Sequence, residues 1–424
     1  MLKERIRKSV GGNRRELVDT LYLVMLQGIN QLLPVLVMPY LMVRLGATGY
    51  GYVGFSLSLI QYLIIIVDFG FNLSATKRIA VVAGDRAAMN RVFWNVVAAK
   101  TLLMSVSTLI VLLLVVSVPT FRLYWRAIVA TFPMLLGSAF TFMWFFQGIG
   151  KIRLFSIMNT VSKMALLPLI FVLVKTPDDY VLAALLQAVV FVSTSLLSNV
   201  YIAVKRLVGW VRPTWTLIKE ELRVSFPLFL STASTSVYTQ LIVVVLGFFC
   251  TTEEIGKYSS AERIMRAVVF LLYTPLNQVF FPRISALAAR HDGTERGLFR
   301  QVRAIVVAVM ALVSAALWTG SWWLPDLLGV DYVGMDTYLR IFSVAPLAIG
   351  VGGVYGQMGL VAIGNEYTSR RFRDVYFAAA AAAVLLMLVL VPLWNATGAS
   401  IVVASTEVIV AVLMIYNFKK YLTV

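Results

Sequence analysis

Charged and amide side chains recur at helical spacing inside long apolar stretches of this 424-residue chain. Gln61, Asp68 and Asn72 are seven and four residues apart, which places them on one face of a helix. Burying such groups in an apolar environment is costly, and function is the commonest reason for it. Carboxylates in such places can bind H+ or Na+, Lys and Arg can bind phosphate groups, and amides can bond to hydroxyl groups.

The candidate groups fall into three chemical classes. Cations that could bind an anionic ligand are Lys163, Arg266, Arg263 and Lys100. Amides that could bond to a polar ligand are Gln27, Asn30, Gln31, Gln61, Asn72, Asn159 and Asn277. Carboxylates that could couple H+ or Na+ to a conformational change are Asp68 and Glu407. These faces cannot all point to lipid, and they predict one shared aqueous cavity.

Several of these residues have a structural alternative. Asp68 could be half of a buried ion pair that holds helices in register. Lys100 lies within about two turns of the end of its apolar segment, so its side chain could extend to the membrane surface. Arg263 and Arg266 could pair with Glu262 at the membrane edge. The sequence alone leaves these alternatives open.

Composition identifies the class of protein that carries these polar helix faces. Hydrophobic residues make up 60% of the chain and charged residues only 13%, whereas a soluble domain is nearer half apolar and a quarter charged. The basic N-terminus is followed by an apolar stretch that is too long for a signal-peptide core, so we expect it to be retained as a first span. We predict an all-α integral membrane protein with 12 transmembrane helices, at residues 20–43, 52–74, 93–117, 123–147, 154–175, 180–204, 224–249, 258–281, 304–323, 336–360, 375–393 and 398–418.

Charge and rare residues narrow the prediction further. A cytoplasmic N-terminus places most of the 37 Lys and Arg residues on cytoplasmic segments, which predicts that both termini are cytoplasmic. The net charge of +17 is therefore a sign of topology, and no basic soluble module suggests a nucleic-acid partner. The single cysteine, Cys250, excludes an internal disulfide, and the single histidine, His291, leaves no histidine cluster for a metal. We expect no cofactor and no metal site.

A repeat with an offset of 205 residues divides the chain. Six predicted spans separate the two copies, so both halves run in the same direction and the pseudo-two-fold axis lies along the membrane normal. We predict two pseudo-symmetric parallel six-helix bundles, residues 1–210 and 211–424, joined by a cytoplasmic linker around 205–223. The matched positions are Gly51 and Gly256, Gln61 and Arg266, Asn72 and Asn277, and Arg78 and Arg283.

Several segments resemble a known family. NQLLPVLVMPYLMVRLGATGYGYVGFSLS and DFGFNLSATKRIA are similar to the opening two helices of bacterial O-antigen and polysaccharide flippases, whose superfamily also contains the multidrug-and-toxin extruders. WFFQGIGKIR resembles that family's signature at the end of helix four, although Gly150 stands where the family often has an acidic residue, so a role for that carboxylate is absent here. The second half resembles the family in EEIGKYSSAERI, PLNQVFFPRIS and LVAIGNEYTSRR.

The resemblance implies a V-shaped pair of bundles that moves an undecaprenyl-diphosphate-linked oligosaccharide across the bacterial inner membrane by alternating access. The implied partners are this lipid-linked substrate, the membrane lipids and other polysaccharide-assembly proteins. The polar stripes agree with such a substrate, because a diphosphate with sugars needs a hydrated path and fixed cations to cross hydrocarbon. H+ or Na+ would be the coupling ion.

Two other functions are consistent with a polytopic chain. A drug or metabolite antiporter of the same superfamily that exports cations should have more acidic than basic groups in its lumen, whereas the candidates here are mainly basic. A polysaccharide polymerase or glycosyltransferase should carry catalytic residues on a sizeable outer loop, but the predicted outer connections 118–122, 176–179 and 394–397 are a few residues each. The chain also lacks a Ser/His/Asp set and a phosphate-binding glycine loop. We therefore expect a transporter and not an enzyme.

Overall fold

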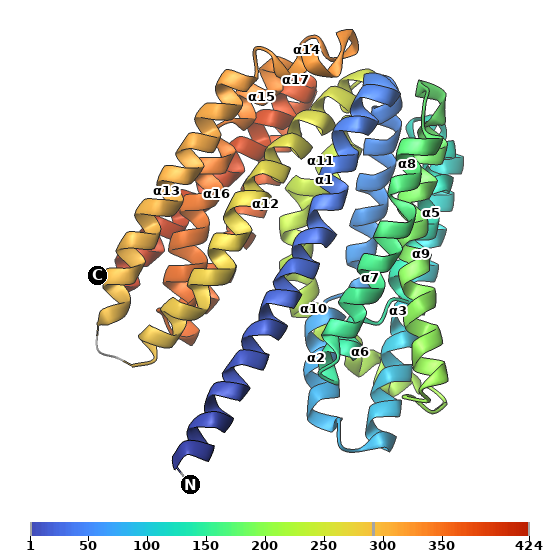
Figure 1. The fold of residues 1–424 in the computed structure, drawn as a ribbon. Helices are drawn as coiled ribbons and strands as arrows, with labels where there is room; N and C mark the ends of the chain where they lie inside the picture. The colour runs from blue at the N-terminus through green and yellow to red at the C-terminus, as the bar shows by residue number, and fades with distance from the viewer. Residues whose placement is uncertain (1, 291–292, 423–424) are drawn as a thin grey trace.

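The structure is a computed structural model that describes residues 2–290 and 293–422, with side chains from residue 32 onward. Every regular element in these residues is a helix. Within these described residues, ten segments are long and apolar enough to cross a membrane, so the chain is a multi-pass membrane protein. Figure 1 shows long helices that run roughly side by side, with both ends of the chain in the lower half of the view.

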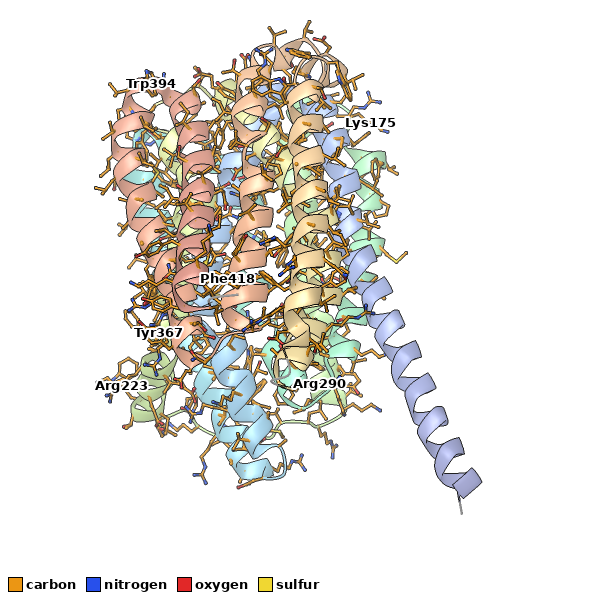
Figure 2. The ribbon with its side chains drawn as sticks, turned by 90° about the vertical axis from the view of Figure 1, so that its left-hand side faces the viewer. Lys175, Arg223, Arg290, Tyr367, Trp394 and Phe418 are labelled. Atoms are coloured by element: carbon orange, nitrogen blue, oxygen red, sulfur yellow. The ribbon has the colours of Figure 1, made fainter. Side chains whose placement is uncertain are left out.

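Two of the ten segments are helical hairpins. Helix α1 (Leu2–Asp68) is interrupted at Gly46, whose φ of 64° is readily adopted only by a residue without a Cβ atom. Helix α17 (Glu366–Tyr421) is interrupted at Trp394 and Asn395, and in Figure 2 Trp394 lies at the opposite end of this element from Tyr367 and Phe418. Both interruptions fall between spans that the sequence analysis separates.

The remaining elements follow in chain order. After α1 come α2 (Phe71–Val82), α3 (Arg86–Ser117), α4 (Pro119–Leu123), α5 (Trp125–Ala139), α6 (Met143–Gly148), α7 (Ile152–Leu166), α8 (Pro168–Leu173), the 3-10 turn η1 (Pro177–Asp179) and α9 (Tyr180–Val204). Then come α10 (Trp215–Ser236), the π-helical η2 (Val237–Leu241), α11 (Ile242–Leu246), α12 (Thr252–Ala288), α13 (Thr294–Gly320), α14 (Leu324–Leu328), the 3-10 turn η3 (Val330–Tyr332), α15 (Met335–Phe342), α16 (Ala345–Gly353) and the π-helical η4 (Val354–Val361).

Side-chain caps and prolines fix several helix boundaries. The Asp85 side chain accepts hydrogen bonds from the backbone N–H groups of residues 87 and 88 at the start of α3. Thr251 forms a capping box with Glu254 at the start of α12, and Asn365 forms one with Thr368 at the start of α17. Pro168 begins α8, since a proline at the first helical position loses no intrahelical hydrogen bond.

Three hydrophobic cores show how the helices are grouped. The largest combines residues of α1, α5 and α9 with residues of α12, α15 and α17. A second contains only residues between Phe71 and Ile218, and a third only residues between Ile284 and Phe418. In Figure 1, α3–α9 lie on the right and α13–α17 on the left; the two groups meet in the upper half and diverge below. The packed interior is therefore continuous at one end and divided at the other.

The two groups meet where α1 crosses α12. Gly51 packs against the carbonyl oxygen of Thr252, and Gly256 packs against that of Ala47, so closely that a Cβ atom at either glycine would collide with it. The two contacts are reciprocal, because adding 205 to 47 and to 51 gives 252 and 256. Reciprocal contact of this kind is the mark of a two-fold axis. The offset found in the sequence thus also relates the two contacts at this crossing.

Candidate functional site

Two adjoining cavities lie among the helices of both groups. They measure about 1300 Å³ and about 610 Å³, and we call them together the central cavity. Gln61 and Arg266, which the offset of 205 relates, line both parts. Each lies ten residues beyond its crossing glycine, about 15 Å along the helix. The residues common to both parts are Pro34, Val35, Gln61, Lys163, Thr239 and Arg266.

Helix α7 supplies one polar wall. Ser156, Asn159 and Lys163 are three and four residues apart, so they form one stripe on this helix, and all three line the larger part of the cavity. Lys163 and Asn159 were predicted as cavity residues, and the structure places both there. Gln61 of α1 lines the same space and adds a second amide.

The opposite wall comes from η2, α12 and α17. Tyr238 and Thr239 lie in the π-helical segment η2, where the wider turn shifts side chains from their α-helical positions. Arg266 of α12 and Glu407 of α17 also line this part. Glu407 is only 7% exposed and lines the cavity, and its role as a coupling group stays a prediction.

Arg266 is held by a carboxylate one turn away. Its Nε donates to Oε1 of Glu262 at 2.8 Å, and the side chain of Glu262 is buried. This is the intrahelical pair that the sequence analysis considered as an alternative, and Arg266 nevertheless lines the cavity. Its Nη2 is buried without a hydrogen-bond partner among the described residues. Arg266 therefore combines a fixed position with a donor that a ligand could use.

Lys100 and Asp68 lie elsewhere. Lys100 Nζ contacts Asp68 Oδ1 at 2.8 Å and the carbonyl oxygen of Ser138 at 3.0 Å, and Lys100 is only 1% exposed. Neither residue lines the central cavity. The structure thus differs from the prediction of Lys100 as a cavity cation, because packing of α1, α3 and α5 turns its amine toward Asp68. The buried ion pair considered for Asp68 is present.

The other predicted residues have varied positions. Arg263 lines the smaller part of the cavity, with its guanidinium 5.5 Å from the centre of the Tyr50 ring. Asn72 Nδ2 lies 3.4 Å from Asp68 Oδ2, and Asn72 lines neither part of the cavity. This differs from the prediction, because the helix breaks at residues 69 and 70, between Asp68 and Asn72. Asn277 also lines neither part, since it lies one turn beyond the cavity residues of α12. Gln27, Asn30 and Gln31 belong to α1, but their side chains lie outside those that the structure describes.

Aromatic residues of the cavity were not predicted. Tyr238, Tyr273 and Tyr376 line its larger part, together with Phe155 and Phe270. The Tyr273 hydroxyl lies 3.4 Å from Oε1 of Gln357, and its ring packs directly against the backbone of Gly353. Tyr238 and Tyr273 lie inside predicted spans, but a ring in such a place occurs equally in a packed core, so the sequence carried no signal that marks these tyrosines as cavity residues.

The lining of the central cavity carries both basic and acidic side chains, and the basic ones are more numerous. Its lining holds Lys163, Arg263 and Arg266 on the basic side, and Glu262 and Glu407 on the acidic side. Within the described ranges 2–290 and 293–422, no cluster of three His, Cys, Asp or Glu residues could hold a metal ion. The arrangement is suited to binding a polar anion between two walls.

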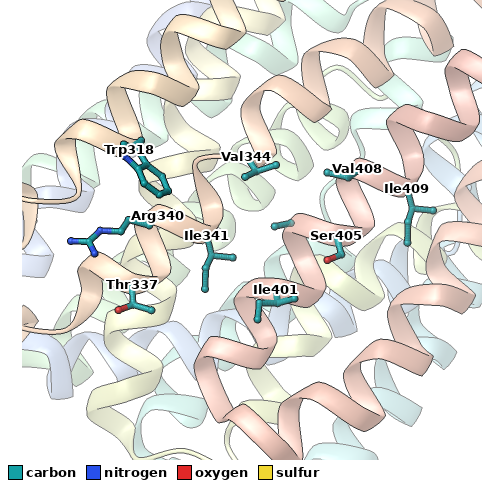
Figure 3. Close-up of a pocket in the computed structure, with 10 residues that line it drawn as sticks. Trp318, Thr337, Arg340, Ile341, Val344, Ile401, Ser405, Val408 and Ile409 are labelled. Carbon is teal, nitrogen blue, oxygen red and sulfur yellow. The ribbon is translucent and has the colours of Figure 1, made fainter.

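A separate cavity of about 660 Å³ opens between α13, α15 and α17 (Figure 3). Its lining is mainly aliphatic and includes Ile341, Val344 and Ile401. The guanidinium of Arg340 points away from these residues in Figure 3 and pairs with Asp336 at 3.1 Å. None of the predicted site residues lines this cavity.

Comparisons with known proteins agree with this geometry. The chain is 28% identical to the "Putative O-antigen transporter" of Escherichia coli (strain K12), over 94% of this chain and 95% of the relative. Its fold is similar to that of the lipid II flippase MurJ in an inward closed conformation, with a TM-score of 0.67, 11% identity and coverage of 94% of this chain and 87% of that one. An inward-facing multidrug resistance MATE family transporter of the MOP superfamily gives a TM-score of 0.65 at 16% identity, covering 91% of this chain and 94% of that one.

The model of one protein family covers most of the chain. It matches residues 17–288, which include α1 from residue 17 onward and every element from α2 through α12. The match therefore covers both polar walls of the central cavity except for residues of α16 and α17. The resemblance noted from the sequence motifs is confirmed. The chain belongs to the polysaccharide biosynthesis protein family.

Proposed function

We propose that this protein is a flippase that moves an undecaprenyl-diphosphate-linked oligosaccharide, such as an O-antigen repeat unit, across the bacterial inner membrane. The observation that carries the proposal is the central cavity, where Lys163 and Arg266 share one space with amides and tyrosines. A diphosphate requires cationic donors, and sugars require hydrogen-bonding groups and flat apolar surfaces. The name of the Escherichia coli relative supports the same substrate class.

The proposed topology has 12 transmembrane helices in two bundles, residues 1–210 and 211–424, with both termini in the cytoplasm. Splitting α1 at Gly46 and α17 at Asn395 turns ten apolar segments into twelve. The divided cores support two bundles, and the position of both chain ends in the lower half of Figure 1 supports a common side for the termini. In this orientation the bundles diverge toward the cytoplasm.

Each wall of the cavity has a proposed role. Lys163 and Arg266 bind the diphosphate, and Arg263 extends the basic surface into the smaller part. Gln61 and Asn159 bond to sugar hydroxyl groups. Tyrosine rings pack against the faces of the sugars, where apolar C–H groups are exposed. The lipid tail stays in the bilayer.

Alternating access follows from the two-fold crossing. The bundles rotate about the contact between α1 and α12, and the cavity opens first to one side and then to the other. Glu407 is the proposed coupling group, because it lines the cavity and binding of H+ or Na+ there would change the charge that Arg266 experiences. Asp68 remains a second candidate through its pair with Lys100. No catalytic role is proposed, and the protein acts as a transporter.

An antiporter for cationic drugs is the less favoured alternative. The fold of the MATE family transporter permits it, since the same two-bundle architecture serves different cargoes. The basic excess of the cavity lining opposes it, because cations would be repelled by Lys163, Arg263 and Arg266.

Substitution of the cavity cations tests the proposal. In proteoliposomes that contain an undecaprenyl-diphosphate-linked oligosaccharide, Lys163→Gln and Arg266→Gln should each lower the rate of translocation by about 10- to 100-fold, because a hydrogen bond to a charged group contributes about 1.5–3 kcal/mol. Lys175→Gln is the matched control, since Lys175 is exposed at the end of α8 and lines no part of the cavity. Equal rates for all three variants would contradict the proposal.

A further inference from the structure

The cavity of about 660 Å³ between α13, α15 and α17 lies apart from the proposed transport path. Among the described residues, its lining shares no member with the central cavity. Trp318, Val344 and Val408 line it and are exposed, so the cavity opens on the outside of the helices, where a membrane-spanning protein meets lipid. We call this cavity the lateral groove.

The lateral groove runs from the membrane interface toward the middle of the bilayer. Trp318 lines it and lies one turn before Trp322 and Trp323 at the end of α13, and all three tryptophans are exposed. Exposed tryptophans of this kind mark the level of the lipid head groups. Ile409, which also lines the groove, lies 14 residues or about 21 Å along α17 beyond the break at Asn395. Since the hydrocarbon core is about 30 Å thick, the groove is deep enough to hold a length of acyl chain.

An accessible ion pair lies at one end of the groove. In Figure 3, Arg340 and Thr337 are at the end opposite Ile409. Arg340 Nη2 lies 3.1 Å from Oδ2 of Asp336, and the two side chains are 38% and 31% exposed. Arg340 Nε donates to Oγ of Ser321 at 3.3 Å. These contacts fix the guanidinium, and neither of them uses Nη1.

The ion pair presents a positive and a negative group side by side. A guanidinium binds a phosphate through two parallel hydrogen bonds, and a carboxylate accepts a charge-assisted hydrogen bond from a primary ammonium group. A phosphoethanolamine head group carries both partners, a phosphate and a primary ammonium. A phosphoglycerol head group has no cation for Asp336, and a choline head group has no N–H to donate. Basic clusters without an acidic neighbour are the surfaces that favour anionic lipids.

We propose that the lateral groove is a binding site for one phospholipid with a phosphoethanolamine head group. The phosphate binds Arg340 and the ammonium binds Asp336, while one acyl chain follows the aliphatic lining past Ile341 toward Ile409. In the proposed topology this lipid belongs to the outer leaflet. The site is additional to the proposed function and does not depend on it.

Helix α15 connects the groove to the helix that crosses α1. Ile341 and Val344 face the groove at the end of α15, whereas Tyr338 and Phe342 are buried on the other side of the helix. The rings of these two residues contact Tyr258 of α12, with ring centres 6.4 and 5.5 Å apart. A bound lipid therefore fills the space behind α15 and supports its packing on α12. Occupancy of the groove should stabilise the folded protein.

Competition between two lipids tests the proposal. The purified protein is stripped of lipid, reconstituted in vesicles of equal phosphatidylethanolamine and phosphatidylglycerol with the same acyl chains, and released into a mild detergent. Native mass spectrometry then counts the lipids that remain bound. The wild type should retain phosphatidylethanolamine over phosphatidylglycerol by about three- to fivefold, the factor that an exposed ion pair can supply. Equal retention, or more phosphatidylglycerol, would overturn the proposal.

Variants assign the two charges. Arg340→Gln should lower the retention of both lipids, and Asp336→Asn should abolish the preference while binding persists. Arg126→Gln is the matched control, because Arg126 is an exposed arginine 5.7 Å from the ring centre of Trp125 and lines none of the three cavities. A loss of preference in Arg126→Gln, or an unchanged preference in Asp336→Asn, would overturn the assignment.

A third variant tests the position of the acyl chain without touching the ion pair. Ser405→Trp fills the middle of the groove, where Ser405 lies between Ile401 and Val408 in Figure 3. It should lower the retention of both lipids, and unchanged retention would overturn the placement of the chain. Phosphatidylethanolamine should also raise the thermal unfolding midpoint of the wild type more than that of Ser405→Trp. None of these measurements requires transport, so their outcome is separate from that of the proposed function.

Discussion

Gly51 and Gly256 lie where α1 crosses α12, and their reciprocal contacts predict that substitutions at the two positions have similar and coupled effects. In Gly51→Ala the new methyl group meets the carbonyl oxygen of Thr252, and in Gly256→Ala it meets that of Ala47. Overpacking of this kind costs about 1–3 kcal/mol. Because the obstacle is backbone and cannot rotate away, we expect the upper part of this range, less about 1 kcal/mol gained in helix propensity. Each variant should therefore lose about 1–2 kcal/mol of stability.

The double variant makes the prediction sharper. Both methyl groups push the same two helices apart, so one displacement relieves both collisions. Gly51→Ala/Gly256→Ala should therefore cost clearly less than the sum of the single variants, a coupling of about 0.5–1 kcal/mol or more. Gly297→Ala is the control, because Gly297 lies in α13 and a Cβ atom added there would have no neighbour within 4 Å, so this variant should be neutral or slightly stabilising.

Unfolding of the purified protein in detergent, followed by tryptophan fluorescence, measures these differences. Translocation in proteoliposomes measured on the same samples shows whether the loosened crossing also changes the rate. The reciprocal contact would be refuted if each single variant were as stable as Gly297→Ala. It would also be refuted if the stability lost in the double variant equalled the sum of the two single losses.

Three further predictions concern single groups. Asp68→Asn should destabilise the fold by about 3–5 kcal/mol, because it leaves the buried Lys100 amine without a counter-charge. Lys100→Met should cost less, because Asp68 is 28% exposed and can be solvated. Thermal unfolding midpoints in the opposite order would contradict the assigned pair. Burial, with a smaller contribution from Glu254, raises the pKa of the Cys250 thiol to about 12, so only about 10⁻⁵ of the thiol is thiolate at pH 7. Maleimide should therefore label Cys250 after denaturation but not in the folded protein. Rapid labelling of the folded protein would contradict this. Glu407→Gln should preserve folding and remove the dependence of translocation on an applied H+ or Na+ gradient, and an unchanged gradient dependence would exclude Glu407 as the coupling group.

Periodicity and repeat spacing can place a residue correctly when its surroundings depend only on the turn of one helix or on the 205-residue offset. The offset of 205 paired Gln61 with Arg266, and both line the shared wall of the central cavity. The stripe of Asn159 and Lys163 depends only on the turn of α7, and it also faces the cavity. The breaks near residues 46 and 395 follow from the polar and glycine-containing gaps between apolar spans.

Residues whose environment depends on packing between helices could not be assigned in the same way. Helical spacing places Asp68 on a face, but only the packing of α1 against α3 decides that Lys100, 32 residues away, turns toward it. The tyrosines of the cavity resemble ordinary core residues in the sequence, since a ring carries no sign of which space it borders. Tyr238 in particular is positioned by the π-helical turn η2, which has no simple sequence pattern.

The two lower cores share no residue, which favours movement of the two groups of helices relative to each other, although Ile218 of α10 packs in the core of the first group and would move with it. Helix α12 has 37 residues and is about 55 Å long, with its glycine crossing near one end. A rotation of only about 10° about that end would therefore carry its far end through about 10 Å. A small change at the crossing is thereby amplified into an opening wide enough for a sugar head group.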